Sequence, residues 1–341
     1  MAATAFSQTS EPCGTSPSLL DNNMTASDNL AAFASRNKVI FLHPAEQRSF
    51  GGPQLSGPIS YLRYVRLLSG EFLLCVGFQG GTQIYSEDGS FLLHLVSTEQ
   101  GNNSDAFVEK LSSHRAACAL LPSANREVLA FGDHRGTVQL VDYRHPNNFA
   151  NLSENIPSHT SGVTCLECVN FLHASRMSMV ATAENGQQQL SSELVVGHED
   201  GSILWWTVAT PGERIQMSKL HQDSFEDVPV NICATGGTFM VVGFGSGRLI
   251  VYTIAARERF AEIAAHARWI TGLAFNPKQE LLVSCAEDTV CNVWRVSEEA
   301  GVLLVHSSVV DTKLLTGCCW LSSTEIGIPA YDSEAYFRLK L

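Results

Sequence analysis

Residues 265–297 read AHARWITGLAFNPKQELLVSCAEDTVCNVWRVS, and this stretch decides the fold. It contains three short apolar runs, at residues 270–275, at residues 281–285 and at the residues leading to Trp294, with polar turns between them. Short runs bounded by turn residues are typical of antiparallel strands. The stretch therefore predicts a small antiparallel sheet, and a fourth strand is expected at residues 302–305.

The same pattern recurs along the chain. Units begin near residues 59, 116, 163, 230, 270 and 314, and a partial unit precedes them. Their shortest spacings, 40 and 44 residues, match the ~40–45-residue period of a four-stranded propeller blade. The sequence thus predicts an all-β fold in which residues 1–341 form a single seven-bladed β-propeller.

The last unit shows only three strands before the chain stops. We expect residues 1–10 to supply the fourth strand, so that pairing of the N- and C-terminal strands closes the ring. A closed ring protects the edge strands of the blades. The polar stretches 97–113 and 170–192 are interpreted as loop insertions.

Four polar residues of the opening stretch have a distinctive spacing. Ser284 lies four residues before Asp288, and Asp288 lies six before Trp294, while His266 precedes the first strand in an entry loop. A buried carboxylate needs hydrogen-bond partners. We expect His266 and Ser284 to satisfy Asp288, and the Trp294 indole to reach the Ser284 oxygen.

The unit at residues 159–219 repeats most of this arrangement. Its Asp200 lies six residues before Trp206, and His159 stands in the entry loop. Val196 occupies the serine position, so the network is expected to be incomplete there. We also assign His114 and His221 to entry loops.

With these residues the chain resembles the WD-repeat (WD40) family, and a group of single-propeller members resembles it more closely. That closer likeness is strongest in AHARWITGLAFNPKQELLVSCAEDTVCNVW, and it continues in VVDTKLL and around PAYDSEAYFRL. It is weaker in NLAAFASRNKVIFLHPA and GFGSGRLIVY. The resemblance implies a propeller without a catalytic motif. WD-repeat proteins as a class are platforms on which other proteins assemble.

Composition narrows the class of partner. A net charge of −12 disfavours binding to nucleic acid, which requires clusters of Lys and Arg. No apolar run approaches the ~18 residues of a membrane span, so no membrane insertion is expected. The N-terminus lacks a signal-peptide pattern, and the ten cysteines are interpreted as reduced. We predict a cytoplasmic protein, with a cilium or flagellum as the alternative location.

Neither a metal nor another cofactor is predicted. The entry-loop histidines are interpreted as structural groups that satisfy buried polar atoms. Cys165 and Cys168 form a CxxC, but residues three apart on a strand point to opposite faces and cannot grip one ion. No nucleophile-elbow, Walker or HExxH motif occurs.

We therefore predict a non-catalytic scaffold or adaptor that binds partner proteins or peptides on the propeller faces. A structural subunit of a large ciliary, flagellar or trafficking assembly is the alternative, and an enzyme using the central channel is less favoured. Arg268 and Trp269 follow the entry-loop His266, and Arg115 follows His114. Arg and Trp are enriched at interface hot spots. These three residues are therefore the candidate partner-binding rim.

Overall fold

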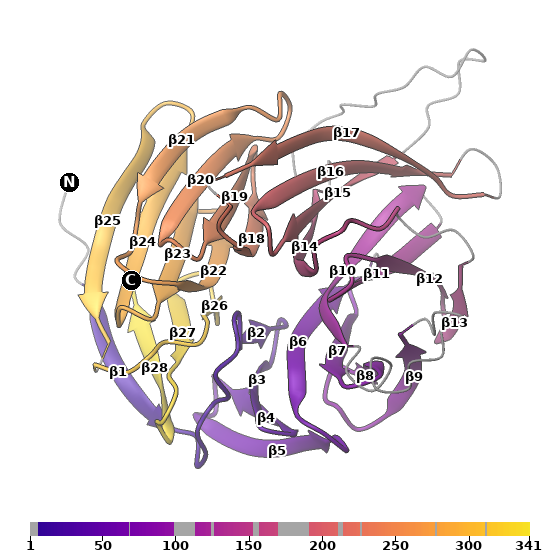
Figure 1. Ribbon diagram of the computed structural model, residues 1–341. Coiled ribbons are helices and arrows are strands. Elements are labelled where there is room, and N and C mark those ends of the chain that lie inside the picture. The colour runs from indigo at the N-terminus through magenta and orange to yellow at the C-terminus, as the bar shows by residue number, and fades with distance from the viewer. Residues whose placement is uncertain are drawn as a thin grey trace.

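A computed structural model describes ten segments of the chain, which are residues 6–67, 69–98, 113–123, 126–152, 157–169, 191–210, 214–225, 227–276, 278–310 and 312–341. Their strands form seven four-stranded antiparallel sheets arranged around a central axis (Figure 1). This arrangement confirms the predicted seven-bladed β-propeller.

The first four blades follow the order of the chain, each from its innermost to its outermost strand. Blade 1 contains β2 (Thr25–Ala26), β3 (Ala31–Ser35), β4 (Lys38–His43) and β5 (Arg48–Gln54). Blade 2 contains β6 (Ile59–Arg66), β7 (Phe72–Phe78), β8 (Gly81–Ser86) and β9 (Leu92–Ser97). Blade 3 contains β10 (His114–Ser123), β11 (Arg126–Asp133), β12 (Val138–Arg144) and β13 (Asn148–Asn151). Blade 4 contains β14 (Val163–Val169), β15 (Ser191–His198), β16 (Ser202–Ala209) and β17 (Gln216–Ser224).

The last three blades complete the ring. Blade 5 contains β18 (Val230–Gly236), β19 (Phe239–Phe244), β20 (Arg248–Thr253) and β21 (Arg259–Ala264). Blade 6 contains β22 (Ile270–Asn276), β23 (Leu281–Ala286), β24 (Val290–Ser297) and β25 (Gly301–Val309). Blade 7 contains β26 (Cys319–Trp320), β27 (Glu325–Pro329), β28 (Ala335–Lys340) and β1 (Ser7–Pro12).

The two ends of the chain close the ring through blade 7. Strand β1 pairs antiparallel with β28, from Ser7 opposite Lys340 to Pro12 opposite Ala335. The closing strand therefore begins at residue 7 and ends at residue 12, whereas the sequence predicts residues 1–10. Most of the two predicted insertions, residues 99–112 and 170–190, lies outside the described residues.

The apolar core is divided among the spaces between neighbouring blades. In β3, Ala31 and Phe33 face a cluster shared with blade 7, while Ala32 and Ala34 face a cluster shared with blade 2. Successive side chains of a strand point to opposite faces. Because each sheet is covered on both faces, its inner strands are apolar at consecutive positions rather than at alternate ones.

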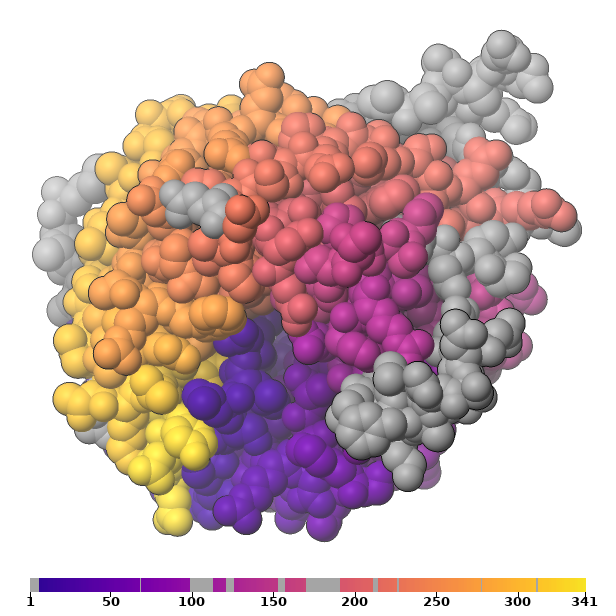
Figure 2. All heavy atoms as spheres, in the orientation of Figure 1, coloured from indigo at the N-terminus to yellow at the C-terminus, as the bar shows by residue number. Residues whose placement is uncertain are grey.

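We call the face that carries the loops into the innermost strands the upper face. Those loops pack against the turns of the preceding blades. Gly247, with a φ of 82°, accepts a hydrogen bond from the His266 backbone N–H at 2.9 Å. A Cβ at Gly247 would lie 2.2 Å from the His266 carbonyl oxygen, so glycine is required there. Figure 2 shows the molecule hollowed near its centre, beside the indigo N-terminal segment.

Among the described residues, no helix is both long and apolar enough to span a membrane.

Candidate functional site

Blade 6 holds a continuous chain of side-chain hydrogen bonds. The Trp294 indole N–H donates to Ser284 Oγ at 2.9 Å, and Ser284 Oγ lies 2.8 Å from His266 Nε2. His266 Nδ1 lies 3.2 Å from both oxygens of Asp288. Each group has a partner when Ser284 donates to Nε2 and Nδ1–H donates to Asp288. The imidazole of His266 thus connects the turn to the third strand.

The Asp288 carboxylate anchors the turn between β23 and β24. It also accepts hydrogen bonds from the backbone N–H groups of Ala267, at 2.9 Å, and Val290, at 3.1 Å. Burial opposes ionisation, but the hydrogen bonds from His266 and these amides outweigh it and lower the pKa of Asp288. The carboxylate therefore holds the entry loop against the turn.

Blade 4 lacks this chain. His159 Nδ1 lies 3.7 Å from Asp200 and accepts a hydrogen bond from the Ser161 backbone N–H at 3.2 Å. The Trp206 indole N–H is buried without a partner in the described structure. Trp206 pairs with Leu194, and Val196, two residues further along β15, takes the place that Ser284 has in blade 6. Blade 4 thus retains the six-residue spacing between Asp200 and Trp206, but it lacks the serine that would connect the histidine to the tryptophan.

Two predicted entry-loop histidines are placed elsewhere. His114 is the first residue of β10, where it is buried and its Nδ1 lies 2.9 Å from Thr82 Oγ1 of the preceding blade. His221 lies inside the outer strand β17, opposite Trp205. Arg115 consequently belongs to β10 and is not part of a loop. It forms an ion pair with Glu199 at the upper end of that strand.

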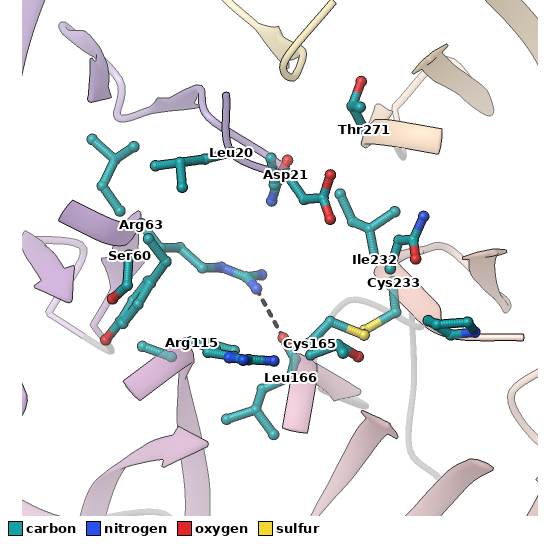
Figure 3. Close-up of a pocket in the computed structure, with 18 of the residues that line it drawn as sticks. Leu20, Asp21, Ser60, Arg63, Arg115, Cys165, Leu166, Ile232, Cys233 and Thr271 are labelled. Carbon is teal, nitrogen blue, oxygen red and sulfur yellow. Dashed lines mark hydrogen bonds between the residues drawn. The ribbon is translucent and has the colours of Figure 1, made fainter. Parts of the chain in front are cut away.

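A cavity of about 840 Å³ opens at the centre of the ring. Its wall is built from the inner strands β6, β10, β14, β18 and β22 and from residues 19–22, which belong to the segment joining β1 to β2. Figure 3 shows side chains from both sides converging on this space. Because strands of five blades and the N-terminal segment meet here, the cavity exists only in the closed ring.

An ion pair lies across the channel in the cavity wall. Arg63 of β6 donates to the Leu166 carbonyl oxygen at 2.8 Å, as Figure 3 shows, and forms an ion pair with Glu167 of β14. Glu167 also accepts a hydrogen bond from Thr235 of β18 at 2.9 Å. Burial disfavours the charged guanidinium, but the Glu167 carboxylate outweighs it and raises the pKa of Arg63. This pair ties together blades 2, 4 and 5.

The opposite side of the cavity mouth contains Trp269 and Asp21. The Trp269 indole N–H donates to the two oxygens of Asp21, each at 3.1 Å, and the ring packs over the Cα of Gly245. Trp269 is therefore half-buried and fixed in place. Arg268 is exposed and, within the part of the chain that the structure describes, has no ion-pair partner. Of the predicted rim residues, Trp269 and Arg115 line the cavity.

The charge state of Asp21 is unusual. The side chain is exposed by area, yet the cavity wall surrounds it. Loss of water from the carboxylate raises the pKa of Asp21 to about 7, although the Trp269 hydrogen bond lowers it and the charge of Glu287 adds to the increase. Sequence spacing could not reveal this contact, because Asp21 and Trp269 are 248 residues apart.

Two free thiols also face each other in the cavity wall. The sulfur atoms of Cys165 and Cys233 lie 3.2 Å apart, on the inner strands of blades 4 and 5 (Figure 3). Cys168 of the predicted CxxC points instead toward the apolar cluster between blades 3 and 4. No group of three or more metal-ligating His, Cys, Asp or Glu residues occurs within the described segments.

Comparison with known proteins places this fold in a family. The family model described as WDR54 matches residues 52–338. The chain belongs to the WDR54 family. WD repeat-containing protein 54 of Mus musculus is 22% identical over 294 residues, which cover 84% of this chain and 80% of the relative. The human protein of that name is 22% identical over 288 residues, covering 82% and 78%. The resemblance to WD-repeat proteins that the sequence indicates is thereby confirmed.

Other WD-repeat proteins resemble this member of the WDR54 family over shorter regions or in fold alone. The target of rapamycin complex subunit LST8 of Bos taurus is 27% identical over 115 residues, covering 31% of this chain and 34% of that protein. A chain in the crystal structure of the mitotic checkpoint complex superposes with a TM-score of 0.67 at 16% identity, covering 98% of this chain and 91% of that one. That likeness establishes the propeller fold.

Proposed function

We propose that this chain is a non-catalytic scaffold or adaptor whose upper face binds partner proteins or peptides. The observation that carries the proposal is the cavity of about 840 Å³ at the centre of the ring, which the closing segment and five blades line together. Its volume lies within the range of about 300–1,000 Å³ typical of binding sites. A rigid disc of this kind presents its loops in fixed positions, which suits recognition.

The names of similar proteins support an assembly role. LST8 is, by its name, a complex subunit, and the superposed propeller comes from the mitotic checkpoint complex. These names describe those proteins, and for the present chain they favour a partner of the same class, another protein. A fold alone does not fix a function, so the cavity and its side chains carry the argument.

The residues with the most catalytic appearance argue against an enzyme. Ser284, His266 and Asp288 are connected in space as the Ser, His and Asp of a hydrolase triad are, with Ser284 Oγ 2.8 Å from His266 Nε2. Ser284 is fully buried, however, and its oxygen also accepts the Trp294 indole N–H. A substrate carbonyl cannot reach that oxygen, so these residues support a structural role.

The test compares two charge reversals on opposite faces. Arg268→Glu changes the exposed rim of the upper face, and Lys278→Glu makes the same change in the exposed loop between β22 and β23 on the other face. Both variants should keep the wild-type melting temperature. Affinity capture with quantitative mass spectrometry should show partners depleted by Arg268→Glu and retained by Lys278→Glu. Equal recovery of every partner by both variants would refute binding at this rim.

A further inference from the structure

Cys165 and Cys233 meet across the boundary between blades 4 and 5. Their sulfur atoms lie 3.2 Å apart, and all ten cysteines of the chain are free thiols. Cys165 is 7% exposed and Cys233 is 5% exposed, and both residues line the central cavity (Figure 3). The pair is therefore packed in the protein on one side and borders the cavity on the other.

A second contact between the same strands has the same offset in the sequence. Glu167 of β14 accepts a hydrogen bond from Thr235 of β18 at 2.9 Å. The two cysteines are 68 positions apart, and so are Glu167 and Thr235, each of which lies two residues beyond its cysteine. Residues two apart on a strand share a face. The inner strands of blades 4 and 5 therefore run in the same direction in a defined register, and this register holds the two sulfur atoms opposite each other.

The neighbouring residues point to other parts of the core. Leu166 lies in the apolar cluster between blades 3 and 4, and Cys168, the second cysteine of the CxxC, packs against that cluster. A Cβ at Gly197 of β15 would lie 2.6 Å from the Cys165 sulfur, so the glycine leaves the space that this sulfur occupies. Cys165 is thus directed toward Cys233 and away from Cys168.

On this geometry we propose that Cys165 and Cys233 are a modification site, at which peroxide in the central cavity forms a reversible disulfide between blades 4 and 5. The sulfur–sulfur distance of a disulfide is about 2.05 Å, so the two sulfur atoms need to approach each other by roughly 1 Å. The bond would fasten two of the strands that form the cavity wall. The inference goes beyond the scaffold function and does not depend on what the cavity binds.

The oxidation consumes one peroxide for each pair of thiols. The Cys165 thiolate attacks one oxygen of hydrogen peroxide, the O–O bond breaks, and the departing hydroxide takes up a proton to become water. The Cys233 sulfur then attacks the sulfenic sulfur of Cys165. The S–S bond forms, the S–O bond breaks, and the Cys233 proton leaves with the hydroxide as a second water. The two thiols lose two electrons, and the peroxide gains them.

The hydrogen bond between the thiols assigns these two roles. Cys233 donates its S–H to the Cys165 sulfur. This hydrogen bond and burial raise the pKa of Cys233 well above its usual range, and the charge of Arg63 opposes the increase without cancelling it. Cys233 therefore keeps its proton at neutral pH and acts as the resolving thiol, which leaves the attack on peroxide to Cys165.

Another thiol pair provides an internal control. Cys285 and Cys318 are hydrogen-bonded to each other in the core between blades 6 and 7. They are 0% and 1% exposed, and neither of them lines the cavity. If access from the cavity determines the reaction, this second pair should stay reduced while the first is oxidised.

The test treats the full reduced chain with graded hydrogen peroxide below its melting temperature. Catalase stops the reaction, N-ethylmaleimide blocks the remaining thiols, and a non-reducing digest is analysed by mass spectrometry. A peptide pair linked through Cys165 and Cys233 should appear, and dithiothreitol should reverse it. Its yield should be at least about tenfold higher than that of a link between Cys285 and Cys318, because oxidation requires an accessible thiol.

Three variants separate the roles of the cysteines. In Cys165→Ala, Cys233 should remain alkylated, whereas in Cys233→Ala, dimedone should trap a sulfenic acid at Cys165. Cys168→Ala retains the proposed pair and should leave the yield of the linked peptide within about twofold of wild type. If a variant fails to fold, the peptide map of the wild-type chain decides.

Three results of that map would overturn the proposal. These are the absence of a link between Cys165 and Cys233, an equal yield of the link between Cys285 and Cys318, and a link that forms only above the melting temperature.

Discussion

Replacing Ser284 by Ala tests the polar network of blade 6. Ser284 is fully buried, and its Oγ stands between the Trp294 indole N–H at 2.9 Å and His266 Nε2 at 2.8 Å. The substitution removes one oxygen and therefore leaves two polar groups in a dry interior without partners. Asp288 keeps its contacts with His266 and with the backbone, so the perturbation is confined to the inner half of the network.

The magnitude follows from these two groups. Each buried polar group left without a partner costs about 1–3 kcal/mol, so the loss of two partners in Ser284→Ala should lower the free energy of unfolding by roughly 2–6 kcal/mol. An unfolding entropy of about 2.1 cal/mol/K per residue, applied to the whole chain, corresponds to about 1.4 °C per kcal/mol. The melting temperature should therefore fall by about 3–8 °C.

Blade 4 supplies the matched control. Val196 occupies the position of Ser284, and the buried Trp206 indole N–H nearby has no partner. Val196→Thr keeps the shape of the side chain and adds the missing acceptor, so the melting temperature should stay constant or rise by about 1 °C. Differential scanning fluorimetry on both variants measures the two effects. A decrease of less than 1 °C in the melting temperature of Ser284→Ala would refute this account of the network. An equal loss of stability in Val196→Thr would also refute it.

Three further perturbations probe the ring and its cavity. Arg63→Met should destabilise the fold by about 2 kcal/mol in urea titrations, because Glu167 would remain largely buried without its cation, and adding Glu167→Gln should restore part of the loss. Deleting residues 1–12 should expose β28 as an edge strand, seen as faster amide exchange along it, and unchanged protection would argue against ring closure by β1. Asp21 has a raised pKa of about 7 beside Glu287, so its carboxyl binds more protons in the folded state and stability should decline from pH 4 to 7. The melting temperature of Asp21→Asn should therefore rise relative to wild type across that range, and a difference independent of pH would contradict the reasoning.

Sequence patterns predict the features that lie within one blade or repeat from blade to blade. The interval between Asp288 and Trp294 identifies the second turn and third strand of a blade, because both lie on one hairpin. The partners His266 and Ser284 follow from the same repeat, and all four meet in the structure. Periodicity also yields seven blades, since each blade repeats the same alternation of strands and turns.

The residue type of a histidine does not by itself show whether it lies in a loop or in a strand. The sequence interpretation places His114 and His221 in entry loops, but His114 begins β10 and His221 lies within β17. A histidine is compatible with either place, and only strand pairing distinguishes them. Contacts between different parts of the ring cannot be predicted from the sequence for a different reason. Asp21 meets Trp269, and Cys165 meets Cys233, through ring closure and blade order, and no local spacing encodes those distances.

The N-terminal segment links the stability of the ring to the candidate site. Residues 7–12 complete blade 7, and the chain then crosses the upper face, where Asn23 is buried and bonds to blade 1 while Asp21 enters the cavity mouth. Opening the ring would withdraw Asp21 from Trp269 and Glu287. A ligand that fills the cavity lined by this segment and by five blades binds only the closed form, so by mass action it stabilises closure. The closure of the ring and the shape of the proposed binding cavity therefore depend on the same stretch of chain.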